Sequence, residues 1–193
     1  MTFKIYTFNN APGESKENLR KVESDKGFIP NIIGVFAGAP AVLDGFLKLK
    51  MAMDQTSLSP TEREIVFLTV SRKNGSPYCT AVHNLEATAN GVDAEIIHAL
   101  QSGEPLPDFK LESLRQYTLG IMDNHGRPSD DAINTFLAAG YKAPQALEIL
   151  LAISLKTLTN YANRLAHPPI DEAFRQFPDH LADKPTGKEH IFS

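Results

Sequence analysis

A single cysteine and a histidine four residues later form the most reactive pairing in this chain of 193 residues. Cys79 and His83 follow an Asn74-Gly75 break, which ends one expected helix before another begins. A thiolate is the nucleophilic form of cysteine, and an imidazole one helical turn away can accept the thiol proton or stabilise the resulting anion. Because the chain has no second cysteine, a disulfide within it is impossible. The pair indicates nucleophilic thiol chemistry.

Two further polar residues can complete a proton relay with this pair. Ser76 precedes Cys79 by three residues, so its hydroxyl lies on the same strip of a helix as the thiol and the imidazole. Glu64 belongs to the preceding helical segment, and it faces this strip if the two helices form an antiparallel hairpin around Asn74-Gly75. The candidate catalytic residues are Cys79, His83, Glu64 and Ser76.

Each of these residues also has a purely structural interpretation. A lone cysteine is often a small buried apolar residue rather than a nucleophile. Ser76 is suited to cap the following helix by bonding the backbone N–H near Cys79, and it could do so while also serving the site. Glu64 could be a solvated helix residue or pair with Arg63 or Arg72 on neighbouring turns. The sequence leaves these interpretations open.

A metal site is the other chemistry available to this segment. Cys79, His83 and Glu86 offer three possible ligands, but His-x-x-Glu on one helix is common by chance and no fourth ligand is evident. Three other histidines lie near expected helix ends or loops, where capping or solvent exposure explains them: His98, His125 and His167. We therefore do not expect a bound metal at these residues.

The two helices that position these residues have clear start and stop signals. Ser59-Pro60-Thr61-Glu62 combines a capping serine, a first-turn proline and a capping-box glutamate, and it predicts a helix over residues 60–73. Ser76-Pro77 then starts a second helix, which Asn90-Gly91 ends. Cys79 is therefore expected in a first turn, near the positive end of the helix dipole.

Similar signals predict helices through most of the chain. Two or three helices fill residues 15–56, and others follow over residues 93–102, over residues 108–124 and after Ser129. No stretch pairs sustained alternation with a hairpin turn, so the predicted fold class is all-α. We expect a single domain over residues 1–193, with residues 1–14 as an N-terminal arm and residues 183–193 as a loose C-terminal tail.

The longest helical pattern follows Pro144, where apolar residues recur at helical spacing over about five turns. These positions include Leu147, Leu150, Leu151, Leu155, Leu158, Tyr161 and Leu165. A stripe of this length is typical of a core helix or of a contact between subunits.

Composition and charge exclude several classes of partner. The chain has 19 basic and 23 acidic residues, a net charge of −4 and no long run of either sign, so neither nucleic acid nor an anionic membrane is an expected partner. Its start lacks the features of a signal peptide, and its longest apolar stretches are far shorter than the roughly 20 residues that span a bilayer. A single unpaired cysteine agrees with a reducing compartment, so we expect a cytoplasmic protein.

The spacing of Glu64, Ser76, Cys79 and His83 resembles the signature E-x11-C-x-x-C-x-x-x-H of the AhpD-like alkylhydroperoxidase and carboxymuconolactone decarboxylase superfamily. The resemblance covers about residues 40–175 and implies an all-helical fold, assembly into homo-oligomers and a thiol peroxidase site without a bound cofactor. In that scheme peroxide oxidises Cys79 to a sulfenic acid, and His83 and Glu64 relay protons.

Ser76 is the main departure from this signature, because it occupies the place of the partner cysteine. A serine can hydrogen-bond or pass a proton but cannot form a disulfide, so a sulfenic acid at Cys79 would need a thiol from outside the chain to reduce it. We therefore expect a thiol-dependent, peroxidase-type antioxidant enzyme that acts on small hydroperoxides with an external thiol reductant. The alternatives are a lyase resembling carboxymuconolactone decarboxylase, which would not require Cys79, and a non-catalytic helical oligomer that binds a ligand or senses oxidation.

Overall fold

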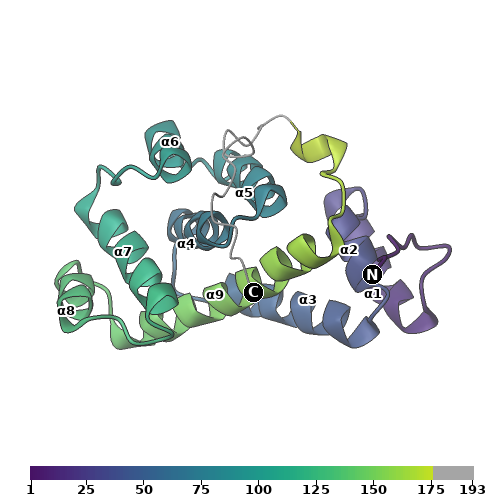
Figure 1. Cartoon of the computed structure of the whole chain (residues 1–193), viewed down its shortest axis with the longest axis horizontal. Coiled ribbons are helices and arrows are strands. Elements are labelled where there is room, and N and C mark those ends of the chain that lie inside the picture. Colours follow the sequence, from purple (N-terminus) through teal and green to yellow (C-terminus); the bar gives the residue numbers. More distant parts are fainter. Residues whose placement is uncertain (176–193) are drawn as a thin grey trace, which may run out of the picture.

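The computed structural model describes residues 1–175, which form α-helices and one short 3-10 helix (Figure 1). The elements of this part of the chain are α1 (Gly13–Lys26), α2 (Asn31–Phe36), α3 (Pro40–Asp54), α4 (Pro60–Lys73), α5 (Pro77–Ala89), α6 (Ala94–Ser102), α7 (Phe109–Asp123), α8 (Asp130–Ala138), α9 (Ala143–Ala166) and η1 (Glu172–Phe174). Residues 1–175 contain no strand, and the prediction of an all-α fold is confirmed.

The helix boundaries follow the local signals of the sequence. α4 covers the predicted residues, and its capping box is formed: Ser59 Oγ accepts from the Glu62 N–H at 3.2 Å, and the Glu62 carboxylate accepts from the Ser59 N–H at 2.8 Å. Gly91, with a positive φ of 72°, follows the end of α5 as expected. α9 begins at Ala143, one residue before the predicted proline. Caps and left-handed residues fix these ends because they act within a few residues of the chain.

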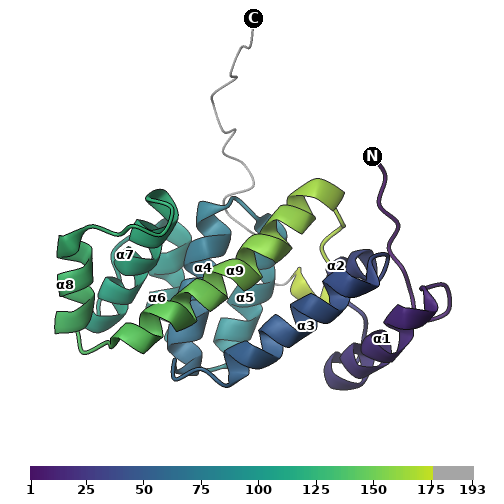
Figure 2. The same ribbon diagram turned by 90° about the horizontal axis from the view of Figure 1, so that it is seen from below.

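α4 and α5 lie in the middle of the molecule, between α6–α8 at one end and α1–α3 at the other (Figure 1). α9 crosses the length of the molecule and contacts α4, α3, α5 and α2 (Figure 2). Buried apolar side chains form two clusters, a larger one around α4, α6, α7 and α9 and a smaller one that joins α1–α3 to the start of α5. Cys79 belongs to the smaller cluster.

The apolar stripe of α9 is only partly core. Leu155 is buried, whereas Leu147, Leu150, Tyr161 and Leu165 are between 46% and 71% exposed. The opposite face of the helix is polar and buried, and it carries Lys156, Thr159, Asn160 and Asn163. The core interpretation is therefore wrong for the four exposed residues, because packing buries the polar side of α9 at its C-terminal half.

The segment before α1 lies on α2, since the Tyr6 N–H donates to the Gly34 carbonyl at 3.0 Å. The predicted tail over residues 183–193 lies outside the described residues. Within residues 1–175, no single helix is both long enough and apolar enough to cross a membrane; α8 and α9 meet these limits only when taken together, and they are bent by 112°.

Candidate active site

The pairing of α4 with α5 brings Glu64 and His83 together. The Glu64 Oε2 atom lies 2.9 Å from His83 Nδ1, and both residues are buried. The other carboxylate oxygen accepts from Asn90 Nδ2 at 3.4 Å, so the start of α4 lies beside the end of α5 and the helices are antiparallel, as expected. An ion pair of Glu64 with Arg63 or Arg72 is wrong, because both arginines contact other groups.

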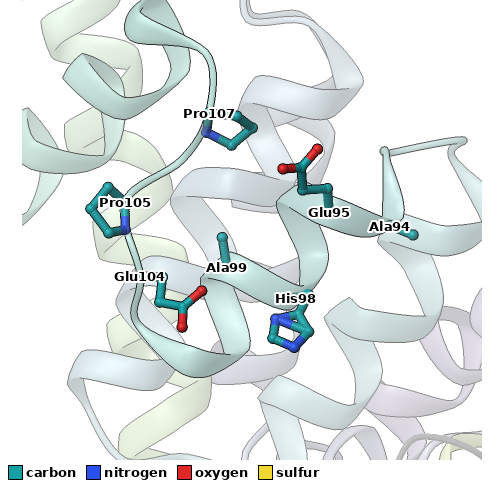
Figure 3. A pocket seen from close by; sticks show the side chains of 7 residues that line it. All are labelled: Ala94, Glu95, His98, Ala99, Glu104, Pro105 and Pro107. Atoms are coloured by element: carbon teal, nitrogen blue, oxygen red, sulfur yellow. The ribbon is translucent and has the colours of Figure 1, made fainter.

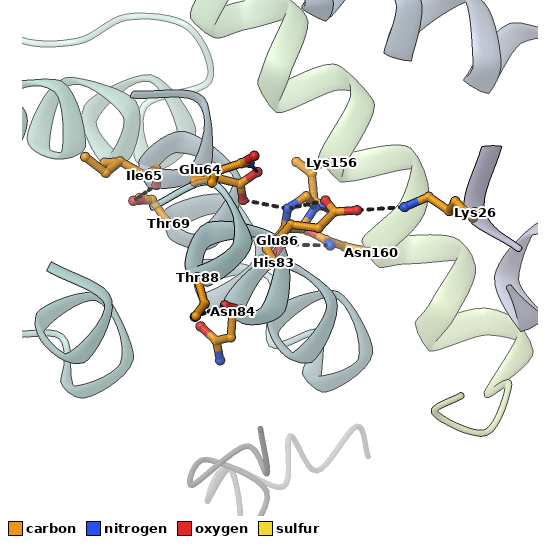
Figure 4. A network of polar contacts seen from close by, with 12 residues as sticks. Lys26, Glu64, Ile65, Thr69, His83, Asn84, Glu86, Thr88, Lys156 and Asn160 are labelled. Atoms are coloured by element: carbon orange, nitrogen blue, oxygen red, sulfur yellow. Dashed lines mark hydrogen bonds and ion pairs between the residues drawn. The ribbon is translucent and has the colours of Figure 1, made fainter. Parts of the chain in front are cut away.

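Lys156 of α9 contacts the other side of the imidazole (Figure 4). Its Nζ lies 2.7 Å from His83 Nε2, it is 5% exposed, and its ammonium also lies over the Phe67 ring at 5.8 Å. His83 Nδ1 faces a carboxylate and therefore carries a hydrogen, so either Nε2 or Nζ must supply a lone pair to the other. One hydrogen bond therefore joins Lys156 Nζ to His83 Nε2, with one nitrogen as donor and the other as acceptor.

Glu86 places a second carboxylate beside the same imidazole. Its Oε2 lies 3.4 Å from His83 Nδ1, and its Oε1 accepts from Lys26 Nζ of α1 at 2.8 Å (Figure 4). Burial opposes the charge of this carboxylate, but the positive charges of His83 and Lys26 outweigh it and lower the pKa of Glu86 to about 2. The imidazole therefore lies between two carboxylates and a lysine.

Of the three possible metal ligands considered from the sequence, His83 and Glu86 lie together, but Cys79 does not join them. The ligand atoms of Glu64, His83 and Glu86 lie within 4.8 Å of one another, and Cys79 is not part of this group. Lys156 already occupies the second imidazole nitrogen, and Lys26 already binds Glu86. These contacts fit a proton relay between charged side chains better than a cation site.

Cys79 is the third residue of α5 and lies in its first turn, as predicted. It is 4% exposed, and its Sγ accepts a hydrogen bond from Asn163 Nδ2 at 3.1 Å. Burial raises the pKa of the Cys79 thiol, but the charge of Lys156 and three nearby polar side chains outweigh burial and lower that pKa below its ordinary value. These side chains belong to Ser76, Asn160 and Thr159.

The hydrogen bonds of His83 do not reach the thiol. Its two ring nitrogens contact Glu64, Glu86 and Lys156, and no hydrogen bond among the described residues joins His83 to Cys79. The spacing of four residues places the two side chains on one strip of α5, but the groups packed on that strip decide where the imidazole points. Within this group of charged side chains, Lys156 is therefore the residue whose charge acts on the sulfur.

Ser76 does not cap α5, and the prediction of a capping hydrogen bond is wrong. Its Oγ accepts from no backbone N–H and is a buried atom without a hydrogen-bond partner among the described residues. The backbone explains this, since Ser76 has φ −111° and ψ 90°, whereas the capping Ser59 has φ −61° and ψ 160°. The Ser76 hydroxyl lies close enough to the sulfur to lower the pKa of the thiol.

Tyr78 anchors the start of α5 beside the thiol. Its hydroxyl donates to the Asp171 carboxylate in the segment that follows α9, and that carboxylate also accepts from the Asn31 N–H at 3.1 Å. Burial and the Asp171 charge raise the pKa of Tyr78 above its ordinary value, so the tyrosine stays protonated as a donor. This contact holds the first turn of α5 against α2.

The polar face of α9 is the part of the site that the sequence analysis missed. Lys156, Thr159, Asn160 and Asn163 follow the pattern i, i+3, i+4, i+7, which places them on one face of the helix. This polar periodicity on a helix with an apolar opposite face was the available signal. Attention to the apolar stripe alone assigned burial to the wrong side.

A surface hollow of about 410 Å³ lies at α6 and the loop that follows it (Figure 3). Glu95, His98 and Glu104 line it, together with two prolines. None of the predicted catalytic residues borders this hollow, so it is separate from the thiol site.

Solved structures with the same all-α fold are known. One is described as an alkylhydroperoxidase AhpD core, an uncharacterized peroxidase-related protein from Ralstonia eutropha JMP134 (TM-score 0.77, 15% identity, 89% of this chain and 93% of that chain). An uncharacterized peroxidase-related protein from Silicibacter sp. TM1040 is similar to the same degree (TM-score 0.76, 16% identity, 90% and 93%). The described helices therefore form an AhpD-like fold.

The debrominase Bmp8 also has this fold. Its cysteine-to-alanine variant in complex with 2,3,4-tribromopyrrole aligns with a TM-score of 0.66 and 20% identity over 85% of this chain and 89% of that chain. Residues 40–106 match the carboxymuconolactone decarboxylase family, whereas no curated protein matches the chain. The chain therefore has an AhpD-like fold, and residues 40–106 within it are similar to the carboxymuconolactone decarboxylase family.

Proposed function

We propose that this protein is a thiol-dependent peroxidase that reduces small hydroperoxides through Cys79. The observation that carries the proposal is the lowered pKa of a thiol in a first helical turn, next to the Lys156–His83–Glu64 relay. A lowered pKa increases the fraction of thiolate, which is the nucleophile that peroxide oxidation needs. The substrate must be small because Cys79 is buried.

The reaction we propose has two proton transfers around one oxygen transfer. The thiol loses its proton to the Lys156–His83 pair, and the thiolate attacks the terminal oxygen of the hydroperoxide. A sulfur–oxygen bond forms, the oxygen–oxygen bond breaks, and Cys79 becomes a sulfenic acid. The leaving alkoxide takes a proton back from the pair and departs as an alcohol.

The return to the thiol requires a reductant from outside the chain. One external thiol attacks the sulfenic sulfur and releases water, and a second thiol resolves the mixed disulfide. Ser76 cannot replace either thiol. A cytoplasmic location, which we keep as a proposal, would supply low-molecular-weight thiols for this step.

A second copy of the chain is the partner we propose for the exposed stripe of α9. Leu147, Leu150, Tyr161 and Leu165 expose apolar surface along one helix, which is typical of an interface between subunits. Light scattering coupled to gel filtration tests this assembly: a monomer at micromolar concentration contradicts it, and so does a Leu150→Glu, Tyr161→Glu double variant with an unchanged mass.

The decisive test is the rate at which peroxide oxidises Cys79. The reduced protein is mixed with hydrogen peroxide or tert-butyl hydroperoxide at pH 7, and the sulfenic acid is trapped with dimedone and measured by mass. We expect a rate constant at least about tenfold above that of free cysteine, because more of the thiol is ionised. The Cys79→Ser variant is the matched control, and a wild-type rate equal to that of free cysteine contradicts the proposal.

The family match over residues 40–106 supports one alternative, a lyase that decarboxylates an unsaturated lactone acid. In that reaction Lys156 would hold the substrate carboxylate, and Cys79 would have no required role. The Cys79→Ala variant separates the two functions. Full activity of this variant on such a lactone acid would favour the lyase. If the wild-type protein is oxidised once by peroxide but does not turn over when a thiol is added, it would instead be a redox sensor.

A further inference from the structure

We propose that Ser76 and Asn163 form a subsite for the oxygen atom that the hydroperoxide transfers to Cys79. This inference rests on the proposed function. Within residues 1–175, three buried side-chain atoms have no hydrogen-bond partner: Ser76 Oγ, Asn84 Oδ1 and Asn163 Oδ1. Two of the three belong to side chains that adjoin the Cys79 sulfur.

Both orphaned atoms belong to side chains that adjoin the sulfur. Asn163 donates from Nδ2 to Cys79 Sγ at 3.1 Å, and Oδ1 is the other end of the same planar amide. The Ser76 hydroxyl comes from the residue one turn earlier, and it acts on the pKa of the thiol. Ser76 is 2% exposed and Asn163 6% exposed, so the protein shields both from bulk solvent.

Leaving such buried atoms without partners costs free energy, and a ligand that pairs with both recovers it. The terminal oxygen of a hydroperoxide carries one hydrogen and two lone pairs. Asn163 Oδ1 can accept that hydrogen, and the Ser76 hydroxyl can donate to the oxygen. The one transferred oxygen matches the two unused groups in donor and acceptor type.

The same two partners serve the product. The thiolate bonds to the terminal oxygen, the oxygen–oxygen bond breaks with its electron pair leaving on the alkoxide, and the hydrogen stays on the transferred oxygen. The resulting sulfenic acid keeps its hydrogen bonds to Asn163 and Ser76. Ser76 therefore stabilises the oxidised form of Cys79 at the position where a second cysteine would consume it.

The subsite also defines the substrate class. A hydroperoxide or hydrogen peroxide presents an O–H group to Asn163 Oδ1, whereas a dialkyl peroxide has no hydrogen to donate and leaves that oxygen unpaired. The subsite therefore favours hydrogen peroxide and small alkyl hydroperoxides over dialkyl peroxides.

The test compares Ser76→Ala and Asn163→Leu with the wild type and with Ser113→Ala. Ser113 is a matched control, because its buried hydroxyl bonds a backbone carbonyl on α7, away from the site. The pH dependence of iodoacetamide alkylation gives the thiolate fraction of each protein. The rate of oxidation by tert-butyl hydroperoxide is then divided by that fraction, which removes any effect through the pKa.

We expect the corrected oxidation rate to fall on the order of tenfold in Ser76→Ala and in Asn163→Leu, and the sulfenic acid to be lost faster after excess peroxide is removed. The control should match the wild type. Corrected rates and sulfenic acid lifetimes within twofold of the wild type in both variants would overturn the subsite. A slow wild-type enzyme would instead contradict the proposed function, and the lifetime of sulfenic acid made with excess peroxide would still test the subsite.

Discussion

α4 and α5 begin with the same dipeptide, and the structure uses the two starts differently. At α4, Ser59 precedes Pro60, and its hydroxyl accepts the Glu62 N–H in a complete capping box. At α5, Ser76 precedes Pro77, and its hydroxyl bonds no backbone N–H. The Ser76 carbonyl instead accepts from the Thr80 N–H, so the helix begins without help from the side chain.

The difference fits the proposed thiol site, because the serine without a capping hydrogen bond is the one beside the thiol. A capping serine typically stabilises a protein by 0.5–2 kcal/mol, and α5 gives up this contribution while keeping the residue that could supply it. The serine that caps is far from reactive groups, whereas the serine that does not cap lies beside a thiol with a lowered pKa. Broken local rules of this kind are concentrated at functional sites.

Two glutamates of α4 repeat the contrast at close range. Glu62 and Glu64 are both buried, but Glu62 binds Lys110 at 3.0 Å and the Tyr141 hydroxyl at 2.9 Å, whereas Glu64 binds His83. Burial opposes the charge of Glu62, yet the Ser59 N–H, Lys110 and Tyr141 outweigh it and lower the pKa of this carboxyl. Glu62 serves the fold, and Glu64 faces the site.

The largest effect on stability should come from a substitution at the start of α4. Glu62→Gln weakens the charged hydrogen bonds to Lys110, Tyr141 and the Ser59 N–H and should lower the free energy of unfolding by about 2 kcal/mol at pH 7. Because the folded pKa of Glu62 is lowered, its contribution is present above pH of about 4.3 and is lost as the pH falls through the folded value. Urea unfolding at pH 7 and pH 3 should therefore show a difference that shrinks in acid.

Alkylation of Cys79 supplies the control for this variant. The rate in Glu62→Gln should match the wild type wherever both are folded, because Glu62 does not contact the site. If Cys79 were alkylated more slowly in Glu62→Gln while the free energy of unfolding stayed unchanged, the start of α4 would influence the thiol at the start of α5.

The sequence predicted what is decided within a few residues. Ser59 and Gly91 set helix ends through their own side-chain or backbone geometry, so α4 and α5 could be placed, and the short connection between them was enough to expect Glu64 near His83. Lys156 and Asn163 are more than seventy residues from Cys79, and their arrival depends on how α9 packs across α5. The lack of a capping hydrogen bond from Ser76 also depends on tertiary context, because the serine of the same Ser-Pro dipeptide caps α4.

A second, smaller effect is expected at the start of α5, where Lys156 controls the pKa of Cys79. Lys156→Met removes the positive charge that most lowers the pKa of Cys79, so that pKa should rise and the alkylation rate at pH 7 should fall about tenfold. The pH profile of iodoacetamide alkylation should shift to higher pH with the same plateau. Lys26→Met is the matched control, since Lys26 binds Glu86 and is not among the groups that shift the Cys79 thiol. A profile that stays in place in Lys156→Met would show that the lysine does not activate the thiol.

The smallest expected effect compares the two serines directly. Ser59→Ala removes a capping hydrogen bond and should lower the free energy of unfolding by about 1 kcal/mol. Ser76→Ala removes a hydroxyl that makes no hydrogen bond to the backbone of α5, so its unfolding free energy should stay within about 0.5 kcal/mol of the wild type. Urea unfolding of both variants under reducing conditions measures the pair. Equal losses would mean that Ser76 caps α5 in solution, and its hydroxyl would then be committed to the helix rather than available to an oxygen bound at Cys79.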